Sequence, residues 1–243
     1  MTMTKILSLE KKSKNGTNRQ EGKFEIKNVT EDSADLYMYG YIADDKWWDD
    51  DIVPQDVKEF LDQVKDVKTL NIYINSGGGS VFAGMAIYNM LKRIDAETTV
   101  YVDGLAASIA SVIAFCGDKL VIPSNAYLMI HKPLMMAYGN ANDLLEAADV
   151  LDKIEEGILN VYKTKVNDDV DIETIKKFVD EETWFTGEDA AKYFDIDVVA
   201  ANKAVAYCAI EGYKNAPAKI SNSTNKELEI EKAKLKLACE MSV

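Results

Sequence analysis

The chain has 243 residues, of which 47% are hydrophobic, and its 41 acidic against 28 basic side chains give a net charge of −13. This apolar fraction suits a protein with a sizeable core, whereas the acidity argues against a nucleic-acid partner and no apolar run reaches the about 20 residues of a membrane span. The N-terminus lacks the apolar segment of a secretory signal and the three cysteines are odd in number and scattered, so we expect a cytoplasmic protein with reduced thiols.

Along the chain, strand-like and helix-like segments alternate after an N-terminal arm at 1–23, which its polar, lysine-rich composition predicts to be flexible. The predicted strands and helices are, in turn, 34–42, 54–64, 70–74, 81–94, 98–102, 120–122, 127–130 and 142–166, where 54–64, 81–94 and 142–166 are the helices. Gly104 is expected to end the strand at 98–102, ahead of the small-residue run 106–114. This alternation is typical of an α/β fold with a parallel sheet.

The C-terminal part reads differently from the folded body, which we place at 24–213. Residues 214–225 have the composition of a linker. Thr224 and Glu227 then form a capping-box pattern, which predicts a short charged helix over 226–243.

Three consecutive glycines, Gly77–Gly79, follow a predicted buried strand and precede a helix. In the simpler interpretation they form a strand-to-helix turn that needs positive φ angles. In the other, the backbone approaches a ligand closely and directs its N–H groups at negative charge. Neither a P-loop nor a dinucleotide-binding motif is present, because no Gly-Lys-Ser/Thr follows and the G-x-G-x-x-G spacing is absent.

Ser108 lies in the small-residue run that follows Gly104. It is either a small residue that caps or packs a helix, or a nucleophile at a strand-to-helix junction. In the second case its hydroxyl is exposed and the N–H group of Ile109 can stabilise an oxyanion.

The chain has one histidine, His131, at the end of the predicted strand 127–130. A lone histidine is more often structural than catalytic, yet any histidine general base in this protein must be this residue. A Ser–His pair also needs a carboxylate that holds the imidazole. The acidic run 180–182 offers one, because the bulky pair Trp184-Phe185 beside it can anchor the run near the core.

Together these pieces resemble the proteolytic subunit of the Clp protease over residues 32–200. The resemblance rests on four motifs in order, Ile74–Tyr88, Gly104–Ser111, Met129–Pro133 and Trp184–Tyr193. It implies an α/β fold of the Clp-protease/crotonase type, a ββα superhelix whose long handle helix matches 142–166. It also implies a serine-type endopeptidase that carries no metal and no cofactor of its own.

The resemblance assigns roles to individual residues. The nucleophile falls on Ser108, the general base on His131 and the acid of the triad on Glu182, with Asp180 as the alternative. The oxyanion donors fall on the backbone N–H groups of Gly78 and Ile109. An extended substrate is expected to bind as a strand beside the same loop, at Gly77 and Gly79.

The resemblance further implies a homo-oligomer of seven-membered rings that stack face to face and enclose the serines. A separate AAA+ ATPase, an unfoldase, feeds polypeptide to such rings, so ATP would be used by that partner alone. Two departures from the family pattern, Gly77 in place of proline and Glu182 in place of aspartate, are similar to the phage and prophage branch. Members of that branch are implicated in processing capsid or scaffold proteins during head maturation.

Three other interpretations stay open on the sequence alone. A crotonase-like acyl-thioester enzyme would use the oxyanion donors but would leave Ser108 and His131 without a task. A Ser/Lys hydrolase would not need His131. A catalytically silent scaffold would keep the ring and lose the chemistry.

Overall fold

The computed structural model describes residues 23–46, 48, 51–201 and 213–217. The chain divides into two units, Met1–Cys208 and Ala209–Val243, and residues 213–217 of the second unit contain no regular helix or strand. The predicted arm, except for its last residue, lies outside the described residues. So do the capping box at Thr224 and the predicted C-terminal helix.

In the first unit, eight strands form one mixed sheet in the order β1-β2-β3-β4-β5-β8, while β6 pairs with β4 and β7. The strands are β1 (Lys23–Lys27), β2 (Ser33–Tyr39), β3 (Thr69–Ser76), β4 (Glu97–Ala107), β5 (Lys119–Pro123), β6 (Tyr127–Ile130), β7 (Thr183–Thr186) and β8 (Asp197–Val199). Pairing is parallel except between β1 and β2 and between β6 and β7. The predicted α/β fold with a largely parallel sheet is therefore confirmed.

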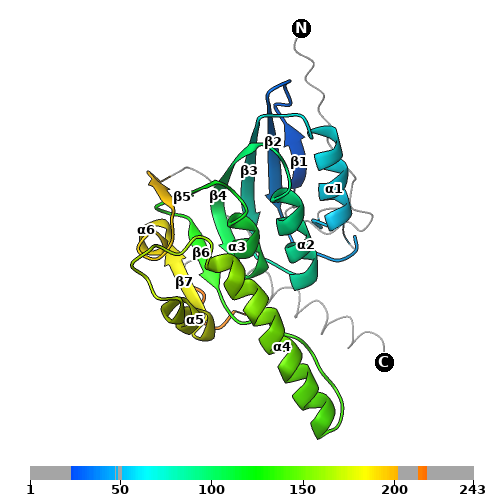
Figure 1. The fold of residues 1–243 in the computed structure, drawn as a ribbon, viewed down its shortest axis with the longest axis vertical. Helices are drawn as coiled ribbons and strands as arrows, with labels where there is room; N and C mark the ends of the chain where they lie inside the picture. Colours follow the sequence, from blue (N-terminus) through cyan, green and yellow to red (C-terminus); the bar gives the residue numbers. More distant parts are fainter. Residues whose placement is uncertain (1–22, 47, 49–50, 202–212, 218–243) are drawn as a thin grey trace, which may run out of the picture. The chain divides into compact units, whose positions relative to one another are not determined.

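The helices of the first unit connect these strands (Figure 1). They are α1 (Pro54–Gln63), α2 (Val81–Leu91), α3 (Ile109–Ala114), α4 (Ala141–Tyr162), α5 (Ile172–Asp180) and α6 (Gly187–Ala190). None of the helices in the described part of the chain combines the length and the hydropathy that crossing a bilayer requires.

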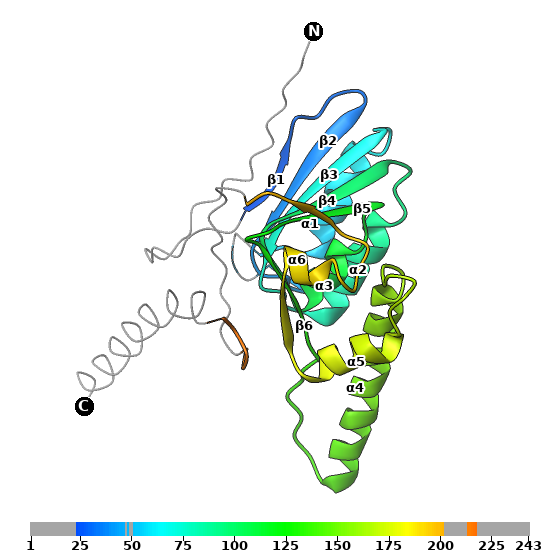
Figure 2. The same cartoon turned by 90° about the vertical axis from the view of Figure 1, so that its left-hand side faces the viewer.

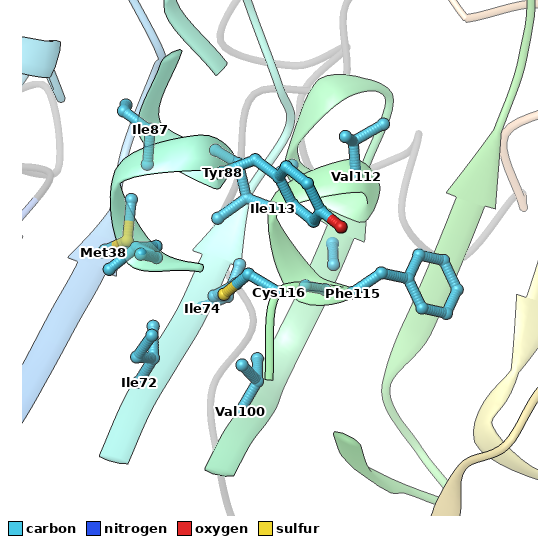
Figure 3. Packing of buried hydrophobic residues seen from close by; sticks show 14 of the residues in the cluster. Met38, Ile72, Ile74, Ile87, Tyr88, Val100, Val112, Ile113, Phe115 and Cys116 are labelled. Carbon is cyan, nitrogen blue, oxygen red and sulfur yellow. The ribbon is translucent and has the colours of Figure 1, made fainter. Parts of the chain in front are cut away.

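The core lies between the sheet and helices α2 and α3. Alternate residues of β3, among them Ile72 and Ile74, are fully buried, as the period of a strand demands when one face meets helices. Figure 3 shows these side chains and Val100 of β4 facing Ile87 of α2 and Ile113 of α3. Since both the nucleophile candidate and the glycine loop sit at the ends of these strands, this core fixes their positions.

The opposite face of the sheet carries a row of half-buried tyrosines. Tyr73 stacks between Tyr37 and Tyr101, with ring centroids 4.5 Å and 5.0 Å apart. Such cross-strand aromatic pairs stabilise neighbouring strands beyond the area that they bury. Partial burial raises the pKa of Tyr73 to about 12.

Strand β4 is longer than expected, because it continues through Gly104 to Ala107. The prediction that Gly104 ends the strand is therefore wrong. The first half of β4 pairs with β5 at Thr99–Tyr101, and the last three residues pair with β6 at Leu105–Ala107. These ladder hydrogen bonds on a buried strand outweigh the local preference of glycine for a turn.

Helix α4 begins at a capping box and projects away from the sheet (Figures 1 and 2). Asn140 Oδ1 accepts hydrogen bonds from the N–H groups of Asn142 and Asp143, at 2.8 Å and 3.3 Å, and the Asp143 carboxylate accepts from the N–H group of Asn140. Only residues in the last third of the helix are buried, so α4 joins the core through its C-terminal end alone. The helix ends at Tyr162 rather than at 166, since Val166 already forms a β-bridge with Phe194.

Candidate active site

Ser108 lies between the last residue of β4 and the first residue of α3, in a backbone conformation that is rare for any residue except glycine (φ 54°, ψ −129°). Its N–H group donates to the carbonyl of Met129 on β6 at 3.0 Å, and its own carbonyl accepts from the N–H group of Ser111 at 3.0 Å. These bonds hold a strained turn in place, which is the arrangement that lifts a serine hydroxyl out of a sheet edge.

His131 reaches Ser108 because β4 and β6 run side by side and end together. Ala107 pairs with Met129, so the residues that follow the two strands emerge next to each other. The Nε2 atom of His131 lies 2.7 Å from the Oγ atom of Ser108, which is hydrogen-bond distance. A serine hydroxyl in contact with an imidazole nitrogen is the pair that general-base activation of a nucleophile requires.

Glu182 lies beside His131 through the antiparallel pairing of β6 and β7. Ile130 pairs with Thr183, so the next position of the register places Glu182 opposite His131. Glu182 has a positive φ of 52°, which turns the chain between α5 and β7. The other acid candidate, Asp180, instead places its carboxylate 2.9 Å from the ammonium group of Lys132.

The electrostatic environment of His131 favours a neutral imidazole. Burial lowers the pKa of His131 below its ordinary 6.5, and the negative charge of Glu182 opposes this shift. A neutral imidazole can accept the proton of the Ser108 hydroxyl, whereas an imidazolium cannot.

The glycine loop approaches Ser108 so closely that a side chain would collide. A Cβ atom on Gly78, whose φ is +96°, would lie 2.8 Å from the Ala107 carbonyl oxygen and from Ser108 Cβ, and 3.3 Å from the Ile109 nitrogen. The positive φ of Gly78 agrees with the interpretation of a turn between strand and helix, and the close approach of the loop is to Ser108. The N–H group of Gly78 donates to Ser76 Oγ at 3.1 Å, and that hydroxyl donates to the carbonyl of Gly40 at 2.6 Å.

On its other side the loop pairs with the chain that follows β2. Ile42 donates its N–H group to the Gly78 carbonyl at 2.9 Å and accepts from the Ser80 N–H group at 2.7 Å. In this parallel bridge the N–H and C=O groups of Gly79 point away from Ile42. A Cβ atom on Gly79 would lie 1.9 Å from the Ile42 carbonyl oxygen, so this position also requires glycine.

Three contributions to the site were not predicted from the sequence. Ser76 holds the glycine loop, Lys132 binds two carboxylates, and Ser111 on α3 links Ser108 to Tyr162 of α4 through its hydroxyl, 2.7 Å from the tyrosine oxygen. All three residues lie inside motifs of the sequence analysis, Ile74–Tyr88, Met129–Pro133 and Gly104–Ser111, but the motifs do not indicate which contacts these side chains make. Within the described ranges, no group of three or more histidine, cysteine or carboxylate side chains is placed to hold a metal ion.

Comparison with known proteins identifies the family. A family model described as Clp protease matches residues 23–203, three quarters of the chain. The chain belongs to the Clp protease family. It is therefore a serine-type peptidase, a hydrolase, and the predictions of family and enzyme class are confirmed.

Curated relatives match more than half of the chain. An "ATP-dependent Clp protease proteolytic subunit" of Ligilactobacillus salivarius is 37% identical over 147 residues, 59% of this chain and 73% of the relative. Proteins of the same description from Bacteroides thetaiotaomicron and Bacteroides fragilis are 32% and 33% identical over 147 residues, and the matches cover 66% and 70% of their lengths.

Proposed function

We propose that this member of the Clp protease family is a serine endopeptidase whose catalytic residues are Ser108, His131 and Glu182. The observation that carries the proposal is the 2.7 Å contact between Ser108 Oγ and His131 Nε2. It joins a serine in a strained strand-to-helix turn to the one histidine of the chain.

In the proposed reaction, Ser108 Oγ attacks the carbonyl carbon of a peptide bond while His131 Nε2 takes the hydroxyl proton. Glu182 orients the imidazole and stabilises the imidazolium. His131 then gives the proton to the leaving amine, and an acyl-enzyme on Ser108 remains. Water, deprotonated by His131, attacks the acyl group, and the proton returns to Ser108 as the new carboxyl terminus leaves.

The tetrahedral intermediate carries negative charge on the former carbonyl oxygen, which the N–H groups of Gly78 and Ile109 would bind. The nitrogen of Ile109 lies 3.3 Å from the position of a Cβ atom on Gly78, so both groups flank Ser108. The Gly78 N–H group would exchange its bond to Ser76 Oγ for one to the oxyanion. A charged acceptor forms the stronger hydrogen bond, which favours this exchange in the transition state.

The substrate would bind as an extended strand along the glycine loop. The N–H and C=O groups of Gly79 point away from Ile42, toward the edge where a further strand can pair. Gly77, half-buried at the end of β3, would lie on the same edge. Backbone pairing of this kind binds polypeptides with little regard to their side chains.

The assembly we propose is a homo-oligomeric ring in the cytoplasm, heptameric and stacked, supplied with unfolded polypeptide by an AAA+ ATPase. The Clp family generally forms rings with such partners, and the subunit itself would need no cofactor. Apolar side chains support an oligomer: Phe82 of α2 and Leu145 of α4 are 70% and 65% exposed. A role in processing phage capsid or scaffold proteins remains a prediction from the residues Gly77 and Glu182.

The alternatives fit the site less well. A Ser/Lys hydrolase needs a neutral lysine at the serine, whereas the ammonium group of Lys132 pairs with two carboxylates and its pKa is raised. The reaction of a crotonase-like acyl-thioester enzyme would not use the Ser108–His131 contact. A silent scaffold would retain that contact without using it.

Labelling with a fluorophosphonate serine probe, read by intact mass, tests the proposal on the full chain. We expect one adduct on the wild-type protein and on the control Ser124→Ala, whose serine lies in the turn before β6. Ser108→Ala and His131→Ala should take up no probe. Labelling that survives His131→Ala would favour the Ser/Lys mechanism, and an unlabelled wild-type protein would favour the scaffold.

A further inference from the structure

Lys132, directly after His131, joins three elements around the candidate site. Its Nζ atom lies 3.2 Å from Glu155 Oε2 on α4 and 2.9 Å from Asp180 Oδ1 at the end of α5. Both carboxylates hold the pKa of Lys132 above its ordinary value. The cation therefore ties the strand end that carries His131 to two helices.

The two partners of Lys132 differ in exposure. The Glu155 side chain is only 8% exposed, whereas those of Asp180 and Lys132 are each nearly half exposed. A buried carboxylate without a cation is costly, so Glu155 fixes where the ammonium group of Lys132 must lie. The more exposed Asp180 is then held to that fixed charge.

Asp180 is the last residue of α5, and Glu182 follows two residues later. Only Glu181 and the positive-φ residue Glu182 itself separate the helix from β7. The Thr183 hydroxyl also donates to the Phe178 carbonyl at 2.7 Å, which closes the same turn. Because only Glu181 lies between Asp180 and Glu182, a displacement of Asp180 also displaces Glu182 and its carboxylate.

We propose that Lys132 is a positioning residue, which bridges Glu155 and Asp180 and thereby holds the turn that keeps Glu182 against His131. The proposal rests on the function proposed above, in which Glu182 orients the imidazole. Lys132 touches neither the substrate nor the reacting atoms in this scheme. It acts on the reaction through the geometry of the acid.

The first test compares Lys132→Met and Lys132→Arg in the full chain, with Lys58→Met as the matched control. Lys58 forms an exposed ion pair with Asp62 on α1. We expect kcat/KM for a peptide substrate to fall by up to about a hundredfold in Lys132→Met, the loss that a misplacement of about 1 Å can produce. Lys132→Arg should recover most of the activity, and Lys58→Met should equal the wild type.

The pH profile of kcat/KM separates positioning from a direct charge effect. The described charged group that acts on His131 is Glu182, while Glu155 and Asp180 face Lys132. The direct charge effect of the substitution would raise the pKa of His131, because a nearby positive charge is lost and the charges of Glu155 and Asp180 are no longer compensated. A movement of Glu182 away from His131 would lower this pKa, because a negative charge then lies farther from the imidazole. If Lys132 acts by positioning, this movement of Glu182 outweighs the direct charge effect, and the acid limb of Lys132→Met should move to lower pH.

A second variant tests whether Lys132→Met loses activity only because the buried Glu155 carboxylate, left without its cation, destabilises the fold. Lys132→Met combined with Glu155→Gln leaves no isolated carboxylate at 155, and it should keep the wild-type melting temperature yet remain impaired. Wild-type kcat/KM in both Lys132→Met variants, or an acid limb that stays or moves to higher pH, would overturn the proposal. A wild-type protein that cleaves no peptide and takes up no serine probe would instead overturn the proposed function.

Discussion

Ser108 is packed so closely against the glycine loop that there is no room for a side chain on Gly78. The positive φ of the serine and the missing Cβ atom of Gly78 together bring two backbone segments into contact. A glycine in this place supplies what no other residue can, because an L-residue with φ near +96° is strained and its side chain would meet backbone. Activity and loop geometry should therefore depend on the same position.

The substitution Gly78→Ala tests this dependence. The added methyl group would collide with the Ala107 carbonyl at 2.8 Å and push the loop away from Ser108. Loss of one oxyanion donor lowers kcat by about 10²-fold or more in comparable hydrolases. Steady-state kinetics on a fluorogenic peptide should show this loss, and an unchanged kcat would remove Gly78 from the oxyanion hole.

The pKa of His131 predicts the pH range of activity. The base works only when neutral, so activity falls as the pH drops through the pKa of His131, which burial holds below 6.5. The acid limb of kcat/KM should accordingly lie below pH 6.5. In Glu182→Gln the opposing charge is lost, so the limb should move lower still and kcat should fall by up to about 10⁴-fold. A limb at higher pH in this variant would contradict the role of Glu182.

At the scale of elements, the site is the meeting point of strand ends. The ends of β4 and β6 deliver Ser108 and His131, and the start of β7 delivers Glu182. Helix α4 also contacts the site, through the hydroxyl of its fully buried Tyr162. This hydroxyl is hydrogen-bonded to Ser111 Oγ, and Ser111 Oγ donates to the Ser108 carbonyl. This pair couples the base of the projecting helix to the turn that holds the nucleophile.

Tyr162→Phe removes one hydrogen bond from this pair without changing the shape of the core. Ser111 keeps its bond to the Ser108 carbonyl, so the free energy of unfolding should fall by only about 1 kcal/mol. Urea denaturation at fixed protein concentration measures it, with Tyr138→Phe as a control because Tyr138 is fully exposed. Equal midpoints for both variants would show that the Ser111–Tyr162 contact adds nothing to stability.

The sequence predicts elements better where the signal is local. Periodicity placed α1 and β3 within two residues of their observed ends, and the motifs placed Ser108 and His131 at strand ends. The prediction that Gly104 ends its strand was wrong because pairing with β6 extends this strand, and no local sequence pattern encodes that contact. The bonds of Lys132 and Tyr162 were missed for the same reason, since their partners lie on elements distant in the sequence.

At the scale of the whole molecule, apolar side chains remain uncovered on a protein of net charge −13. Phe82 lines a groove of 540 Å³ between α2 and α4, together with Met85, Val150 and Ile154. Exposed apolar surface next to a strongly charged body is typical of a surface that another protein covers. A neighbouring subunit of the proposed ring is the occupant that we expect.

Phe82→Glu places a charge in this groove and should lower the mass of the assembly seen by native mass spectrometry. The side chain is 70% exposed, so the fold of the single subunit should tolerate the change. Lys58→Met on α1 changes the net charge by the same one unit and is the control. A wild-type mass in Phe82→Glu would place the subunit contacts elsewhere, and a monomeric wild-type protein would contradict the ring.

Because the chain has one histidine and that residue contacts Ser108, the imidazole resonances in a nuclear magnetic resonance spectrum all come from the candidate site. Every subunit thus contributes one set of imidazole peaks, and no second histidine has to be told apart from it. A single set of peaks would mean that all sites in an assembly are equivalent. Two sets in a fixed ratio would count subunits whose nucleophile and base are arranged differently.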